Sequence, residues 1–95
     1  MILKAHEFDR IVTKYGFTIR DTGDRHAYLE YEGHIVVRTK RSYVKGKDLP
    51  FSDKIRQQLC LNEQQMSEAI GCSFTRDHYL EHLRRRGVLP PPSTR

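Results

Sequence analysis

The sequence predicts an α+β fold in the order α-β-β-β-α, with a three-stranded antiparallel sheet packed on helices and one or two short helices added at the C-terminal end. Three observations predict it. The chain has only 95 residues, its first segment has apolar residues at helical spacing, and the next three segments alternate between apolar and polar residues. A chain of this length buries a thin core, so its fold must be simple.

The first predicted element is a helix over residues 5–15. Its apolar residues share one helical face. They are Phe8, Ile11, Val12 and Tyr15. Gly16 follows directly, and glycine is favoured just after the last turn of a helix.

Three strands are predicted next, over residues 17–22, 25–32 and 34–40, forming an antiparallel meander. The cluster Asp21-Thr22-Gly23-Asp24 predicts a turn between the first two strands. Glu32-Gly33 predicts a tight hairpin loop between the last two.

Side chains alternate across a strand, which assigns each strand residue to one face of the sheet. The residues expected to face the helices are Ala27, Leu29 and Tyr31. The residues expected to face outward are His26, Tyr28, Arg38 and Lys40. On the third strand, Ile35 and Val37 are expected to share one face.

The C-terminal part carries further helix starts. A helix is predicted from near Ser52, Asn62 and Gln65 have the spacing of a capping box, and Thr75 is the expected cap of the next helix. We expect residues 1–71 to form the α/β core. Residues 72–95 are expected to be a helical extension and proline-rich tail of the same compact domain.

The formal net charge of +5 comes from one stretch of the chain. Residues 38–47 hold five cations and no acid, so the remainder is balanced. The cations are Arg38, Lys40, Arg41, Lys45 and Lys47. Lys and Arg contacts to phosphate supply most non-specific affinity for nucleic acid, and Tyr43 in the same stretch can stack on a base. A solvated charged loop is the other interpretation left open.

His26 is the candidate catalytic residue. An exposed imidazole beside cationic side chains suits RNA cleavage, because it can take the proton from a ribose 2′-hydroxyl while Arg and Lys stabilise charge on the phosphate. The alternative is that a single histidine on an open sheet face is a tolerated polar residue.

The sequence predicts neither a cofactor nor a metal centre. Cys60 and Cys72 lack the paired spacing of a zinc site and are interpreted as small hydrophobic residues. His78 and His82 could share a helical face, but no third ligand lies near them in sequence. No apolar stretch reaches the length of a membrane span and the N-terminus has no signal-peptide core, so we expect a cytoplasmic protein.

The ordered set of these features resembles the HicA toxins of bacterial and archaeal toxin–antitoxin pairs. The resemblance covers roughly residues 3–70. It is carried by Tyr15-Gly16-Phe17, the glycine turn followed by His26, the basic third strand, Lys47-Asp48-Leu49-Pro50, and Leu61-Asn62-Glu63 before Met66.

This resemblance implies a fold like a double-stranded-RNA-binding domain and activity as a small metal-independent ribonuclease that acts on messenger RNA. It implies His26 as the functional histidine, although Gly23-Asp24-Arg25 stands where the family has Gly-Ser. The Val-Pro-x-His element that leaves the third strand in many members is also missing. Phosphate contacts are therefore expected from Arg38, Lys40 and Arg41, with Arg25 in the same role.

The resemblance also implies a protein partner, a HicB-like antitoxin that covers the functional face. Tyr28 and Tyr43 are the expected aromatic anchors of that contact. A non-catalytic RNA-binding module of the same fold is the main alternative, and a protein that only binds other proteins is a third. A homodimer is also left open.

Overall fold

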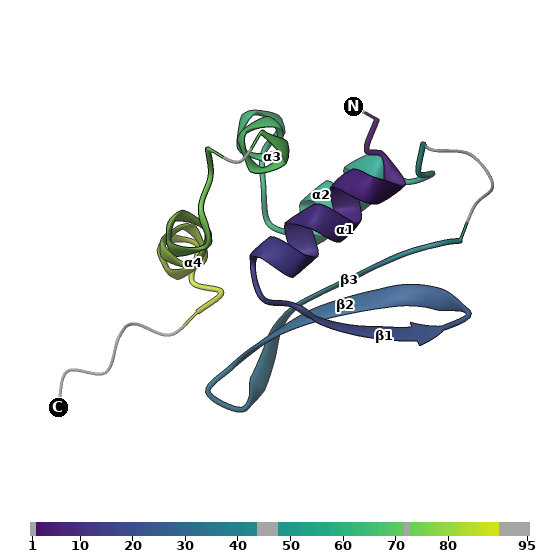
Figure 1. Cartoon of the computed structure of the whole chain (residues 1–95). Helices are drawn as coiled ribbons and strands as arrows, with labels where there is room; N and C mark the ends of the chain where they lie inside the picture. The colour runs from purple at the N-terminus through teal and green to yellow at the C-terminus, as the bar shows by residue number, and fades with distance from the viewer. Residues whose placement is uncertain (1, 44–47, 72, 90–95) are drawn as a thin grey trace, which may run out of the picture.

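The elements follow the predicted order. The computed structural model describes residues 2–43, 48–71 and 73–89, and within these ranges it contains one three-stranded sheet and four helices (Figure 1). In chain order they are α1 (Ala5–Lys14), β1 (Thr18–Thr22), β2 (Asp24–Tyr31), β3 (His34–Arg41), α2 (Ser52–Gln58), α3 (Glu63–Ile70) and α4 (Arg76–Arg85). The predicted α+β class with an α-β-β-β-α order is confirmed.

The sheet is an antiparallel meander in the order β1-β2-β3, so β2 is the central strand. The predicted hairpin loop is confirmed, since Tyr31 pairs with His34 around Glu32 and Gly33. Both loop residues have positive φ, 51° and 83°, which is the backbone of a type I′ turn and matches the twist of the flanking strands.

A β-bulge in β3 corrects one expectation. Leu29 pairs with Val37 but Glu30 pairs with Ile35, so Val36 is an extra residue on β3. An extra residue reverses the face of everything beyond it. Val37 is therefore buried while Ile35 is exposed, and the prediction that they share a face is wrong.

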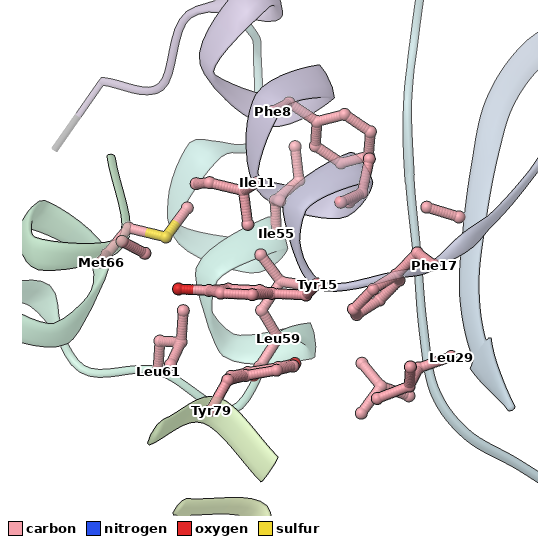
Figure 2. Close-up of a cluster of buried hydrophobic side chains, with 14 of the residues drawn as sticks. Phe8, Ile11, Tyr15, Phe17, Leu29, Ile55, Leu59, Leu61, Met66 and Tyr79 are labelled. Atoms are coloured by element: carbon pink, nitrogen blue, oxygen red, sulfur yellow. The ribbon is translucent and has the colours of Figure 1, made fainter. Parts of the chain in front are cut away.

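Helices α1 and α2 lie side by side over one face of the sheet, and α3 and α4 lie beyond one end of them (Figure 1). The inward side chains Ala27, Leu29 and Val37 of the sheet are buried in one cluster with apolar residues of all four helices. Figure 2 shows Leu29 of β2 and Phe17, the residue before β1, pointing toward this cluster. None of the helices within the described ranges covers the outward face of the sheet.

The predicted capping boxes are both present. The Asn62 side chain accepts from the Gln65 amide at 2.7 Å, and the Gln65 side chain accepts from the Asn62 amide at 3.0 Å. Thr75 and His78 repeat this exchange at the start of α4. Each box satisfies backbone N–H groups that a helix start would leave unpaired.

Two tyrosines join α4 to the rest of the molecule. The Tyr15 and Tyr79 rings stack with centroids 4.5 Å apart and planes 12° apart. The Tyr79 hydroxyl donates to the Leu59 carbonyl at 2.9 Å, and the Tyr15 hydroxyl donates to the Phe74 carbonyl at 2.6 Å. Burial raises the pKa of Tyr79, so its phenol remains a hydrogen-bond donor.

None of the helices in the part of the chain that the structure describes is long and apolar enough to cross a membrane.

Tyr79→Phe is expected to lower the free energy of unfolding by about 1–2 kcal/mol, because the buried Leu59 carbonyl loses its donor while the ring stack remains. Urea denaturation followed by circular dichroism measures the change. Tyr28→Phe, on the outward face of the sheet, is the matched control and should change stability by less than about 0.5 kcal/mol. Equal stability of the wild type and Tyr79→Phe would contradict the assigned role of this hydroxyl.

Candidate functional site

Three side chains form a row across the outward face of the sheet. In the strand register, Arg20 of β1 lies opposite His26 of β2, and His26 lies opposite Lys40 of β3. Directly opposed residues of antiparallel strands have Cβ atoms about 4.5–5.5 Å apart. His26 is on the central strand, and its imidazole therefore has a cationic side chain of a neighbouring strand on either side. We call Arg20, His26 and Lys40 the histidine row.

A second opposed pair, Tyr28 and Arg38, lies next to this row. Arg20 and His26 of the row and both residues of this pair line an open hollow of about 520 Å³. The residues around the hollow are Arg20, Thr22, His26, Tyr28, Glu30, Ile35 and Arg38. His26 and Tyr28 are half-buried, whereas Arg20 and Arg38 are exposed. The two half-buried rings thus form the floor of the hollow, and the exposed cations form its sides.

Acidic groups offset only part of the positive charge on this face. Asp24 Oδ2 lies 3.4 Å from Lys40 Nζ, and the Lys40 side chain is 60% exposed. Glu30 is the other acid beside the hollow. Exposed ion pairs contribute little free energy, so a phosphate group can compete with Asp24 for Lys40.

This arrangement has the elements of acid–base chemistry on an anionic substrate. Imidazole is the side chain that gains and loses a proton near neutral pH. Cations placed where negative charge develops stabilise a transition state. Among the described residues, the outward face places these two kinds of group next to each other at the histidine row.

Asp9 of α1 holds other cations away from this face. Arg41 Nε lies 2.9 Å from Asp9 Oδ1 and Arg41 Nη2 lies 3.0 Å from Asp9 Oδ2, a bidentate pair, and Arg41 is only 9% exposed. Arg25 Nη1 also reaches Asp9 Oδ2 at 3.0 Å. Both guanidinium groups therefore lie on the side of the sheet that faces α1. We call Asp9, Arg25 and Arg41 the Asp9 cluster.

Tyr43 extends the Asp9 cluster at the end of the sheet. Its hydroxyl is hydrogen-bonded to Asp21, and its ring lies 5.8 Å from the Arg25 guanidinium and 5.2 Å from that of Arg41. The hydrogen bonds from Tyr43 and then from Arg25 lower the pKa of Asp21. The contacts with Tyr43 and Asp21 raise the pKa of Arg25. Tyr43, Asp21, Arg25 and Arg41 thus form a polar network that connects the ends of the strands to Asp9 of α1.

The candidate residues predicted from sequence thus separate into two groups. The structure brings together His26, Tyr28, Arg38 and Lys40. It places Arg25, Arg41 and Tyr43 in the network around Asp9. Lys45 and Lys47 lie outside the described residues.

Arg20 is the site residue that the sequence interpretation missed. A signal for it exists, because a hairpin centred on Gly23 pairs Thr22 with Asp24 and therefore brings Arg20 opposite His26. Alternation along β1 also sets Arg20 on the same face as Thr18 and Thr22.

The structure gives no further support for a metal centre. The described residues contain no cluster of three or more His, Cys, Asp or Glu side chains that could hold an ion. His82 is hydrogen-bonded through its two ring nitrogens to Gln65 and to the Cys60 carbonyl, so it joins α4 to the preceding segment.

Comparison of the chain with protein-family models, with curated proteins and with solved structures found no match.

Asp9→Asn is expected to lower the free energy of unfolding by about 1–3 kcal/mol, because it leaves the largely buried Arg41 without its carboxylate. Denaturant unfolding measures the change. Arg10→Gln, at the adjacent exposed position of α1, should alter stability by less than about 0.5 kcal/mol. An unchanged unfolding midpoint in Asp9→Asn would show that the Asp9 cluster does not anchor the sheet.

Proposed function

We propose that this protein is a metal-independent ribonuclease whose active site is the histidine row. The observation that carries the proposal is the register, which sets His26 on the central strand with Arg20 on one side and Lys40 on the other. None of the described helices covers the face around it, so a polynucleotide can approach it from solvent.

The chemistry is an intramolecular transesterification of RNA. His26 takes the proton of a ribose 2′-hydroxyl, the 2′-oxygen attacks the adjacent phosphorus, and the bond from phosphorus to the 5′-oxygen breaks. The products are a 2′,3′-cyclic phosphate and a 5′-hydroxyl, whose oxygen takes its proton from water. Arg20 and Lys40 stabilise the charge that develops on the non-bridging phosphate oxygens. DNA lacks the 2′-hydroxyl and is not cut.

The biological role that fits this activity is that of a HicA-like toxin acting on messenger RNA in the cytoplasm. The resemblance in the order of elements and the position of His26 after a glycine turn support this proposal. A HicB-like antitoxin with an acidic contact surface would be steered toward the cationic outward face. Tyr28, half-buried beside His26, is the aromatic anchor that we assign to that contact.

A non-catalytic RNA-binding module is the second candidate. One observation favours it: among the described residues around the hollow, His26 is the only histidine, so acid and base cannot be two imidazoles. In that case Arg20, Arg38 and Lys40 hold RNA on the outward face of the sheet, and no bond is cut.

His26→Ala is expected to reduce the rate of RNA cleavage by at least about 10²-fold, since it removes the general base. Labelled single-stranded RNA is incubated with purified protein in the presence of a chelator, and the products are resolved on a denaturing gel. His34→Ala is the matched control, because His34 lies on the same sheet at the hairpin end and should cut at the wild-type rate. Binding by the wild type without any cleavage products would replace the ribonuclease proposal with the RNA-binding module.

Arg20→Ala is expected to slow cleavage by roughly 10–10²-fold, and the decrease should lie mainly in kcat if Arg20 stabilises the transition state. Single-turnover kinetics separate this effect from weaker binding. Arg10→Ala on α1 is a control in which the same charge is removed from the opposite side of the molecule. If both variants lose activity equally, the cations act only through overall charge and not through the histidine row.

A further inference from the structure

A second, smaller hollow of about 240 Å³ lies where the end of β3 meets the start of α2. Lys40, Phe51 and Lys54 are among the residues that line it. β3 is an edge strand of the sheet, and the hollow is lined by the end of this strand and by residues of α2 and the segment just before it. Lys40 also belongs to the histidine row, so one lysine is shared by the row and this hollow.

Phe51 lines this hollow and has a backbone conformation that large residues rarely adopt. Its φ and ψ are 60° and 33°, in the left-handed region, and its side chain is 74% exposed. A bulky residue with positive φ is uncommon, and such strain concentrates where a side chain has a task. Phe51 is the N-cap residue of α2 and its carbonyl accepts from the Ile55 amide at 3.0 Å, but its ring lies outside the core and makes no capping contact.

The charge around Phe51 suits an anion. Among the described residues that line the hollow, Lys40 and Lys54 are exposed cations and none is acidic. The third cation, Arg41, is already paired with Asp9. An exposed ring and two lysines around one hollow match a nucleotide, because a base can stack on the ring while adjacent phosphates contact the ammonium groups.

We propose that this hollow is a subsite for one nucleotide of a single-stranded RNA that continues from the histidine row across the edge of β3. The base stacks on Phe51, and Lys40 and Lys54 hold the phosphates on either side of it. The substrate class is single-stranded, because bases in a duplex are stacked on one another and cannot stack on a side chain. This inference rests on the proposed RNA-cleaving function and specifies its substrate.

The test measures the affinity of fluorescein-labelled single-stranded RNA of about ten uridines by fluorescence anisotropy. All proteins carry His26→Ala, so the RNA stays intact during the titration. Phe51→Leu keeps an apolar side chain at the strained position but removes the aromatic face, and it should weaken binding about tenfold. Phe51→Tyr keeps a ring and should bind within about twofold of the parent protein.

Phe51→Gly adds a readout that a merely structural residue would not give. Glycine adopts positive φ without strain, so this variant should unfold at a higher urea concentration than the parent while binding RNA as weakly as Phe51→Leu. Lys54→Ala should weaken binding and reduce the slope of log affinity against log salt by about 0.7, the value for one phosphate contact on a single strand. Arg10→Ala, on α1, is the matched control and should leave the slope unchanged.

The position of the base is tested directly by replacing one uridine at a time with 5-iodouridine and irradiating the complex. A cross-link that mass spectrometry maps to Phe51 supports the subsite. Cross-links confined to the outward face, with equal affinities of parent and Phe51→Leu, overturn it. If instead Phe51→Gly abolishes a dimer seen by sedimentation while RNA affinity is unchanged, Phe51 belongs to a contact between two copies of the chain and the subsite is again overturned.

These outcomes are separable from the fate of the proposed function. Binding through Phe51 by a wild-type protein that cuts no RNA would leave the subsite standing and remove the ribonuclease. Cleavage that Phe51→Leu leaves unchanged in both rate and affinity would remove the subsite alone. No RNA binding at low salt would remove both.

Discussion

The bidentate ion pair between Asp9 and Arg41 is the interaction on which the rest of the structure depends. It binds α1 to the end of β3 and fixes Arg41 on the inward side of the sheet. Since consecutive strand residues point to opposite faces, Lys40 must then face outward. Residues that lie opposite each other on neighbouring strands share a face of the sheet. His26 pairs with Lys40 and Arg20 pairs with His26, so both also face outward. One helix–strand ion pair thus determines which cations lie on the outward face of the sheet.

The helices and turns could be predicted because they depend on residues close together in the sequence. The site was harder to predict because it depends on pairing between residues that are far apart in the sequence. Asn62 and Thr75 predict the starts of their helices, because a capping residue needs only a partner three residues further along the chain. The Val36 bulge has no such signal, because an extra residue is defined only against the partner strand. The sequence assigns Arg25 to phosphate binding, whereas alternation sets it on the side of Ala27 and its partner Asp9 is remote in sequence.

The C-terminal helices support the candidate site from a distance. Lys14 donates to the Ala69 carbonyl at 2.6 Å, and Arg76 donates to the Tyr15 carbonyl at 3.2 Å, so α3 and α4 are held at the end of α1. Gly16, with a φ of 79°, lets the chain turn there, and a Cβ on it would lie 3.2 Å from Arg76 Nε. This docking keeps α4 beside the sheet and leaves the outward face to other molecules (Figure 1).

The bulge at Val36 reverses the alternation of inward and outward side chains between the two halves of β3. Before it, the odd-numbered Ile35 faces outward, and after it the even-numbered Arg38 and Lys40 do. The pairing of β3 with β2 at the hairpin end is therefore set separately from their pairing at the basic end. Residues around the hairpin can gain or lose one position, and the bulge can absorb the shift by moving or disappearing. The pairing of Arg20, His26 and Lys40 is therefore insulated from length changes at the Glu32-Gly33 hairpin, so sequence drift there need not alter the histidine row.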